Sequence, residues 1–493
     1  MSTRRQFLES LAATGGLAGL LGTLGGCEQT SDRLLALLLP EEAVEPRPPS
    51  GAGIDELTHA LNRLTWGPRP DDRARVESMG WQAFVDGQLD PASIDDRRCE
   101  LRVAEIETLH LPRGELYEHS PAQIMADLSR ARLLRALHSR RQLHEVMVDF
   151  WSDHFNIGVA KGDCRWMKLA DDREVVRPHA LGRFRDMVRA SATSPAMLVY
   201  LDGADNKVVH PEDRPNENHA RELLELHTLG VHGGYTQRDV MEAARCLSGW
   251  TFTHDWRRFF TARVAFDPQR HDDGAKEVLG VTIPAGGGAD DLERLLDVVC
   301  FHPSTARHIA RRLCQAFVAA APGPATVDAA AAAFADSGGD IAATLRAVFA
   351  TPEFAASRGG LLKRPMRFVL SALRALDART DGGTALVAHL ERMGHAPFAF
   401  PTPDGYPLEP QPWLGSLLWR WKFALDLARG RVAGTRIDAP GLSERMGGRA
   451  ALVCHLLGRS PTDAEREVLV EAAGEAPATA LALCLAAPAF QRH

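Results

Sequence analysis

The densest group of chemically capable side chains lies in NENHARELLELHTLG, residues 216–230. Asn216 is suited to cap the start of a helix, and Gly230 is suited to end it. His219 and Glu222 are three residues apart, so they share one side of that helix. A histidine and a carboxylate at this spacing can bind a metal ion in helical bundles, although the familiar order is Glu-x-x-His. The segment is therefore a candidate site that needs further ligands from elsewhere.

An ordinary helical hairpin explains many of the same residues. Glu217, Arg221 and Glu225 follow one another at four-residue intervals, and such ion pairs contribute about 0.2–0.5 kcal/mol each. A second helix is predicted after the glycines, because Thr236 and Asp239 resemble a capping box. The charged residues are thus explained equally well by a solvated helix as by a chemical site.

Other candidate ligands lie far from this segment. His154 stands in DFWSDHFNI, where its aromatic neighbours argue against a plain surface position. His271 and Asp272 stand in RHDDGAK, a tight polar turn, and His59 and His302 are weaker candidates. A divalent metal bound by such residues could polarise a substrate or activate water. The alternative is that each histidine is satisfied in the core or in a solvated turn.

Several well-known catalytic motifs are missing. His144 and Glu145 begin like a zincin motif, but Val148 stands where the second histidine should be. The region after the leader has no GxSxG elbow, no P-loop and no GxGxxG that opens a helix. These absences remove the sequence arguments for those classes of enzyme, and a site assembled from distant residues stays open.

The N-terminal residues predict export. TRRQFL, residues 3–8, matches a twin-arginine signal and precedes an uncharged apolar run that ends in LGGC. We expect residues 1–27 to be a signal peptide with a lipobox, so that Cys27 carries lipid in a periplasmic or outer-membrane-anchored lipoprotein. The alternative is a plain signal cleaved nearby. No later run suggests a membrane span, so the lipid is the expected membrane anchor.

Composition and periodicity predict a mostly α protein. Hydrophobic residues make up 45% of the chain, and the net charge of −7 argues against nonspecific binding to nucleic acid. We expect a flexible linker over 28–53 and a large multi-helical body over 54–430, with at most a short β-hairpin near 259–283. Residues 431–493 are expected to form a helical hairpin that packs on the body.

Seven segments of the chain carry a recognisable pattern: HALNRLTWGP, FWSDHFNI, AMLVYLDGADN, PNENHARELLELHTLGVHGGYTQRDVMEAARCLSGW, HDDGAKEVLG, HPSTARHIARRLCQAF and KRPMRFVLSALRAL. Together with a Pro-rich segment over 396–413, they resemble the DUF1800 family, a group of large bacterial proteins of uncharacterised function. The segments follow the order of the family and span about 55–430.

The resemblance implies a partner and a set of site residues. Members are often exported and encoded beside DUF1501 proteins, which resemble alkaline phosphatases and sulfatases, so a DUF1501-like partner is expected. The family commonly has Tyr at the position of His219 and often Phe at that of His227, which weakens a metal role for both. The candidate catalytic residues are then Glu217, Arg221, Glu222 and His154, and the candidate metal ligands are His154, Glu222, His271 and Asp272.

Two functions agree with these observations. The first is an exported enzyme or accessory factor of the cell envelope with a polar, metal-dependent site. The second is a non-catalytic surface lipoprotein that binds or scaffolds a DUF1501-like partner or an envelope glycan. Convergence of the candidate residues in one pocket favours the first, whereas their dispersal as separate salt bridges favours the second.

Overall fold

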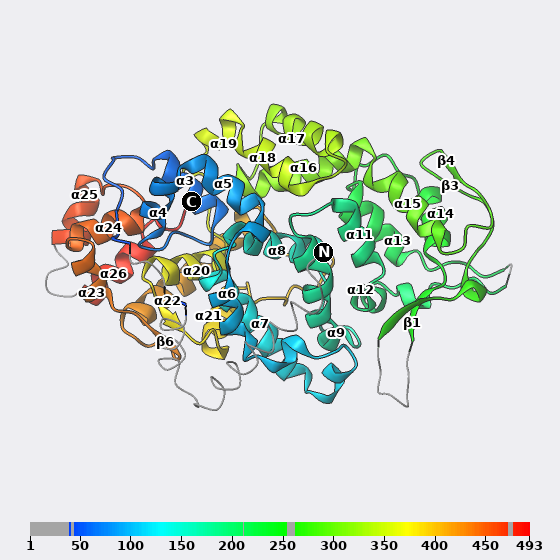
Figure 1. The fold of residues 1–493 in the computed structure, drawn as a ribbon, viewed down its shortest axis with the longest axis horizontal. Helices are drawn as coiled ribbons and strands as arrows, with labels where there is room; N and C mark the ends of the chain where they lie inside the picture. Colours follow the sequence, from blue (N-terminus) through cyan, green and yellow to red (C-terminus); the bar gives the residue numbers. More distant parts are fainter. Residues whose placement is uncertain (1–38, 41–43, 211, 254–261, 472–476) are drawn as a thin grey trace.

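The computed structural model describes residues 39–40, 44–210, 212–253, 262–471 and 477–493. TRRQFL and Cys27 lie outside these residues. The described chain forms an elongated, mostly helical body (Figure 1), which confirms the predicted fold class. No helix within these ranges is long and apolar enough to cross a membrane.

The N-terminal part of the body is built around two long central helices. Helix α7 starts where Ser120 caps the amide of Gln123 and Pro121 occupies the first turn, which suits a residue without an N–H group. Helix α8 buries nearly its whole length. The helices here are α3 (Glu56–Leu64), α4 (Asp72–Met79), α5 (Trp81–Leu89), α6 (Arg97–Ala104), α7 (Pro121–His138), α8 (Gln142–His154), α9 (Cys164–Asp171), α10 (Arg177–His179), α11 (Phe184–Ala192) and α12 (Pro195–Tyr200).

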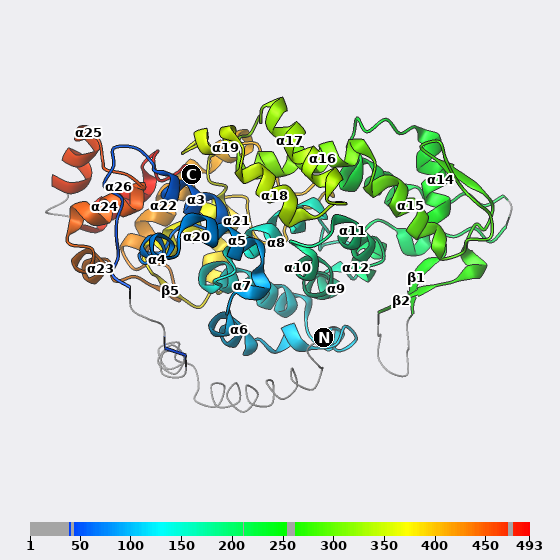
Figure 2. The same cartoon turned by 45° about the horizontal axis from the view of Figure 1, so that its top comes forward.

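The middle of the chain forms one end of the body and one of its long edges. Figure 2 shows α14, α15 and the β1–β2 hairpin at the right-hand end, with α16 to α19 along the top. The helices are α13 (Asn218–Glu222), α14 (Gln237–Leu247), α15 (Asp290–Cys300), α16 (Pro303–Phe317), α17 (Pro324–Asp336), α18 (Ile341–Phe349) and α19 (Pro352–Ala356). A continuous apolar core joins these helices to the N-terminal and C-terminal helices of the described chain.

The C-terminal helices return to the side of the N-terminal ones. Residues 431–493 contain several helices, and the last of them, α26, packs against α22. The final residues pair with the body, because the amide of Lys363 donates to the carbonyl of Gln491 at 2.8 Å. The helices are α20 (Pro365–Ala375), α21 (Thr384–Arg392), α22 (Leu417–Ala428), α23 (Ala439–Arg445), α24 (Arg449–Leu457), α25 (Asp463–Arg466) and α26 (Pro477–Ala486).

The described strands form three short antiparallel pairs, where one hairpin was expected. They are β1 (Trp250–Thr253) with β2 (Arg263–Phe266), β3 (Lys276–Val278) with β4 (Val281–Ile283), and β5 (Arg379–Thr380) with β6 (Thr435–Arg436). Leu279 and Gly280 both have positive φ, which is the conformation of a tight two-residue hairpin turn between β3 and β4. The third pair joins segments more than fifty residues apart, so local sequence patterns did not indicate it.

Candidate functional site

The helix that carries the 216–230 motif contains a π-helical turn. Helix α13 continues into a π-helix, Leu223–Thr228, in which the amide of Leu229 bonds the carbonyl of Leu224, five residues back, at 2.9 Å. The hydroxyl of Thr228 donates to the carbonyl of Leu223 at 2.7 Å and supports the wide turn. Such turns re-aim the side chains around them and often occur at functional sites. The sequence predicted a regular α-helix, because no local pattern marks this insertion.

The charged pair at the start of this helix is partly exposed. Arg221 binds Glu217 at 2.9 Å, as the four-residue spacing predicted, and Gln237 donates to the same carboxylate at 2.6 Å. The predicted capping box of Thr236 and Asp239 is present. Glu217 itself takes the N-cap position expected for Asn216, whose side chain accepts instead from the amide of Asn218. These contacts hold the two helices of the hairpin together.

Glu222 faces a different set of groups. Its carboxyl is about half buried, and burial together with the charge of Glu225 raises its pKa. Asp404, from the Pro-rich segment, adds to the same rise. Burial and the neighbouring Glu225 also raise the pKa of Tyr235, to about 12. The motif helix therefore carries an acidic face beside the Pro-rich segment.

His154 lies in a buried nest of rings at the end of α8. Its Nε2 lies 3.0 Å from the carbonyl oxygen of His227, and its ring centroid lies 6.2 Å from that of His227 and 6.1 Å from that of His308. Burial, followed by the charge of Arg312, lowers the pKa of His154 well below its ordinary value. The side chain is therefore a neutral imidazole held in the core.

His271 and Asp272 belong to a separate network beside α14 and α15. The Nδ1 of His271 lies 2.8 Å from the carbonyl oxygen of Ser248, and its Nε2 lies 3.2 Å from Asp291. Asp272 accepts two hydrogen bonds from Arg245, at 2.7 and 3.0 Å, and these lower its pKa. The turn is thus largely closed by internal contacts.

The four candidate metal ligands do not converge. Glu222 lies on the motif helix, and His154 contacts the carbonyl of His227 in the same helix. His271 and Asp272 instead contact Asp291 and Arg245. Three of the four already use their ligand atoms in hydrogen bonds or ion pairs inside the protein. Within the described ranges, no three His, Cys, Asp or Glu side chains form a group that could hold a metal ion. This arrangement does not fit a metal shared by the four residues.

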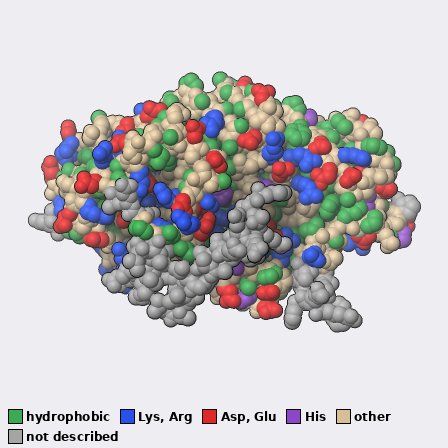
Figure 3. Space-filling model, viewed as in Figure 1, with side chains coloured by type: hydrophobic (Ala, Val, Ile, Leu, Met, Phe, Trp, Pro, Cys, Tyr) green, Lys and Arg blue, Asp and Glu red, His purple; other side chains and the backbone are tan. Residues whose placement is uncertain are grey.

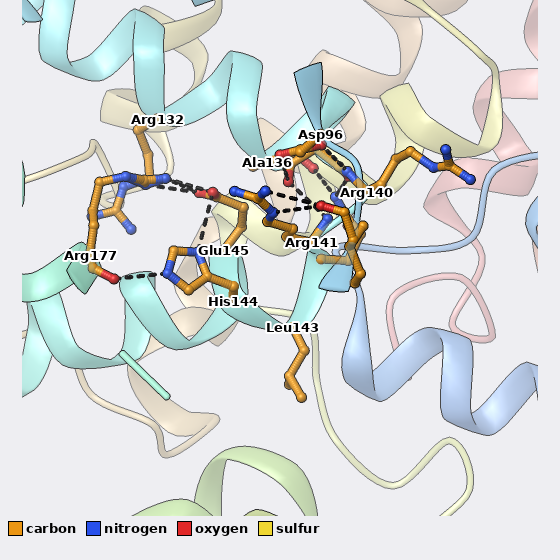
Figure 4. A network of polar contacts seen from close by, with 12 residues as sticks. Asp96, Arg132, Ala136, Arg140, Arg141, Leu143, His144, Glu145 and Arg177 are labelled. Carbon is orange, nitrogen blue, oxygen red and sulfur yellow. Dashed lines mark hydrogen bonds and ion pairs between the residues drawn. The ribbon is translucent and has the colours of Figure 1, made fainter. Parts of the chain in front are cut away.

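Sequence reasoning missed a row of buried carboxylates on α8. Glu145, Asp149 and Asp153 are spaced by four residues and are each less than 10% exposed. Arg177 binds Glu145 at 2.5 Å, and Arg364 binds both aspartates, at 2.7 and 2.6 Å. Figure 4 shows the first part of this row, where Arg177 meets Glu145. The available signal was three acids at one helical spacing within an otherwise apolar helix.

The arginines decide how these carboxylates titrate. Burial is the largest influence on Glu145 and raises its pKa, but the charges of Arg177 and Arg135 and the contact with His144 together outweigh burial, so the net pKa is lowered. Burial and the negative charge of Asp149 raise the pKa of Asp153, and together they exceed the lowering effect of Arg364, so the net pKa is raised. Buried carboxylates of this kind require their partners, because an unpaired buried charge is strongly destabilising.

The Pro-rich segment 396–413 is fixed on the end of α8. The side-chain amide of Asn156 donates to the carbonyls of residues 400 and 402 at 3.0 and 2.7 Å. The hydroxyl of Tyr200 donates to the carbonyl of residue 401 at 2.8 Å. Gly405 packs so closely on Asp153 that a Cβ there would lie 2.0 Å from its carbonyl oxygen. The buried row on α8 therefore supports the backbone that carries this segment.

An exposed apolar stripe follows the Pro-rich segment directly. Leu414, Leu417, Leu418 and Trp421 are spaced at i, i+3, i+4 and i+7, and Leu418 is 73% exposed. Four of the eleven large apolar side chains that are exposed in the described chain thus lie within eight residues. The opposite side of α22 packs into the core through Phe423 and its neighbours. The sequence analysis did not single out this stripe.

The charges elsewhere are mixed. On the face shown in Figure 3, basic and acidic side chains are interspersed, and apolar side chains gather in several places between them.

The seven cysteines in the described ranges are free thiols, most of them buried.

Comparison with known proteins gives one match. The family model "Protein of unknown function (DUF1800)" matches residues 59–492. No curated protein and no solved structure matches the chain. The match covers nearly the whole chain, including the C-terminal helices and every candidate site residue described above. The chain therefore belongs to the DUF1800 family.

Proposed function

We propose that this protein is a non-catalytic binding protein of the cell envelope whose partner is a DUF1501-like exported protein. The proposal rests on the apolar stripe formed by Leu414, Leu417, Leu418 and Trp421. Contiguous exposed apolar side chains on a soluble protein typically mark an interaction site. Their helical spacing suits a groove on a partner, which would bind the stripe as one face of a helix.

The buried network has a positioning role in this proposal. Arg364 holds Asp149 and Asp153 on α8, and the backbone of Asp153 contacts Gly405 of the Pro-rich segment. Within that segment, the indole of Trp413 donates to the carbonyl of Pro407 at 3.1 Å. A rigid segment loses little conformational entropy when a partner binds. Arg364, Asp149 and Asp153 thereby contribute to binding through the support they give to the segment that precedes the stripe.

The dispersal of the candidate residues supports binding over catalysis. Glu217 and Arg221 form an ion pair that joins two helices, His154 is buried as a neutral ring, and Asp272 is held by Arg245. Each contact has a structural purpose of its own. In the part of the chain that the structure describes, His271 and Asp272 belong to a network separate from that of His154.

A photo-activated cross-linking residue placed at position 418 tests the proposal in cells that make the DUF1501-like protein. We expect a cross-linked product that contains that protein. The same residue at Phe301, which is 54% exposed in the turn after α15, is the matched control and should give none. Equal products from both positions, or none from position 418, would contradict the proposal.

From the predicted leader we propose export by the twin-arginine route and lipid attachment at Cys27, with the residues that follow Cys27 as a tether to the membrane. The tether ends before residues 50 and 51, whose carbonyls accept hydrogen bonds from Ser460 at 2.8 Å. The Cys27→Ser variant should then move from the membrane fraction to the soluble periplasmic fraction, because a protein without the lipid lacks its anchor. A variant that stays in the membrane fraction would contradict lipid attachment at this residue.

The metal content of the protein distinguishes a metal-dependent enzyme from the proposed non-catalytic binding protein. Mass spectrometry on protein matured by its own export route should find less than one equivalent of any divalent metal. Stoichiometric metal that both Glu222→Ala and His154→Ala abolish, in variants with an intact fold, would support a metal-dependent enzyme instead.

A further inference from the structure

A cavity of about 370 Å³ lies on another part of the molecule, among α3, α4, α5, the end of α7 and α20. Its size falls within the range of small-molecule sites, roughly 300–1,000 Å³. Figure 2 shows these helices together in the left half of the body. None of the candidate site residues or the stripe residues lines this cavity.

The walls of the cavity are of two kinds. Apolar side chains form one part of the lining, including Leu61, Val76, Phe84 and Ile94. Arginines form another part, and the members of this set are Arg69, Arg75, Arg140 and Arg374. Such a lining suits a molecule that has both an apolar part and a negative charge.

The acidic residues of the lining are already neutralised. Asp72 binds Arg374 at 2.9 Å, and Asp71 binds Arg75 at 2.8 Å. Asp95 is held by Arg97, whose hydrogen bonds lower the pKa of that carboxyl to about 2. Each of these aspartates forms its ion pair with another arginine, so Arg69 and Arg140 have no ion pair with an aspartate of the lining, although their charges act on Asp71 and Asp95.

Two arginines of the lining keep donors to spare. The guanidinium contacts of Arg69 are long, at 3.4 Å to His138 and 3.6 Å to Asp377. The side chain of Arg140 makes no hydrogen bond or ion pair with the described chain, and Figure 4 shows it pointing away from the α8 network. Both guanidinium groups can donate to an anion.

The lining also contains a histidine in a positive field. Burial lowers the pKa of His138 well below its ordinary value, and nearby positive charges lower it further. The charges belong to Arg102, Arg69, Arg374 and Arg98. An excess of positive charge around a partly enclosed cavity attracts anions.

Gly87 keeps the cavity open. It lies inside α5, where glycine costs about 1 kcal/mol relative to alanine. A Cβ at this position would meet no atom within 4 Å, and its φ is not positive, so neither packing nor backbone conformation requires a glycine. The missing side chain instead leaves space beside the arginines.

We propose that this cavity binds a small amphiphilic anion. Its carboxylate or phosphate accepts hydrogen bonds from Arg69 and Arg140, and its apolar part lies against Leu61, Val76 and Phe84. The site is independent of the stripe on α22.

Calorimetric titration of the full exported protein tests this site with four probes. Octyl phosphate and octanoate carry an acidic head on an apolar chain, octyl glucoside has the same chain without the charge, and inorganic phosphate lacks the chain. We expect an acidic octyl probe to bind, and octyl glucoside and inorganic phosphate to bind at least about tenfold more weakly, since one charge-assisted contact is worth about that factor. All probes are used below their micelle-forming concentrations.

Variants connect the binding to the cavity. Arg69→Gln and Arg140→Gln should each weaken binding of the acidic probe about tenfold. Gly87→Leu should abolish binding without lowering the melting temperature, because leucine favours a helix and fills free space. Arg238→Gln, which changes an exposed arginine of α14 outside the lining, should bind as the parent does. If Gly87→Leu fails to fold, Gly87→Ala gives the same test with a smaller side chain.

Three results would overturn the site. The first is that neither acidic probe binds more tightly than octyl glucoside. The second is that inorganic phosphate alone binds as tightly as octyl phosphate. The third is that two separate variants, a folded Gly87→Leu (or Gly87→Ala) variant and the Arg69→Gln variant, both bind the acidic probe with the affinity of the parent.

Discussion

Arg364 binds two buried carboxylates with separate nitrogens of its guanidinium group, Asp149 at 2.7 Å and Asp153 at 2.6 Å. Arginine suits this position because its planar group offers several donors in fixed directions. Two carboxylates so close together in the core repel one another unless a positive charge lies between them. At the scale of single residues, this arginine therefore matters more for the fold than the exposed charges of the motif helix.

Replacement of Arg364 should strongly destabilise the protein, and removal of the two carboxylates that it binds should reduce this loss of stability. Arg364→Met is expected to lower the free energy of unfolding by about 3–5 kcal/mol, because it leaves Asp153 unpaired and Asp149 with only Arg132, at 3.7 Å. Arg364→Met combined with Asp149→Asn and Asp153→Asn should recover part of this loss. Denaturant unfolding measures both. A single variant as stable as the parent would contradict the assigned role of Arg364.

The buried histidines predict how stability depends on pH. Burial lowers the pKa of His227 to about 3 and that of His308 to about 4 in the folded protein. In the unfolded chain these groups titrate near 6.5, so their contribution is fully present above that pH and is lost as the pH falls toward 4. We expect the protein to lose stability steeply in this range.

His227→Phe isolates one of these contributions. The Nε2 of His227 is buried without a hydrogen-bond partner, and its ring lies 5.0 Å from that of Phe155, so phenylalanine should fit the nest. Between pH 6 and 4 the variant should lose stability less steeply, by up to about 1.4 kcal/mol per pH unit. Urea unfolding at several pH values measures the slope. Identical slopes in parent and variant would show that His227 does not resist protonation.

At the scale of elements, the Pro-rich segment depends on a close backbone contact. Gly405 has a φ of 69° and lies against the carbonyl of Asp153, so a side chain there meets both strain and a clash. Gly430 has nearly the same φ, 65°, but a Cβ there would meet nothing within 4 Å. The two glycines therefore separate the effect of strain from that of contact.

Gly405→Ala should destabilise the protein more than Gly430→Ala. The control should cost about 1 kcal/mol from backbone conformation, and Gly405→Ala should cost more because the segment must also move away from α8. Gly405→Ala should in addition weaken binding of the partner, although it leaves the stripe side chains unchanged. Thermal unfolding and the binding measurement check the two effects. Equal losses in the two variants would show that the contact does not position the segment.

Local elements could be predicted from the sequence where the signal was local. The capping box at Thr236 and the Glu217–Arg221 pair follow from spacing alone, and both are present. The π-turn at Leu223–Thr228 could not be predicted in this way, because it differs from an α-helix by a single inserted residue. The partners of Asp149 and Asp153 were missed because Arg364 lies more than two hundred residues away.

At the scale of the whole molecule, the helical fold class follows from composition and periodicity, whereas the surface does not. The stripe at Leu414, Leu417, Leu418 and Trp421 has the spacing of a core-facing helix, and only the packed structure shows that this side is exposed. The candidate metal ligands were likewise grouped by residue type, and the structure distributes them between separate networks.

The affinity of the DUF1501-like protein for the parent chain and for the Leu418→Ser, Trp421→Ser double variant tests the central claim most directly. Both side chains are exposed, so the variant should keep the stability of the parent within about 0.5 kcal/mol. We predict that calorimetry finds binding to the parent and at least about 30-fold weaker binding to the variant, the loss expected for one hot-spot residue. Phe301→Ser, an exposed apolar change in the turn after α15, should bind as the parent does. Absence of binding to the parent, or equal binding to the double variant, would contradict the account.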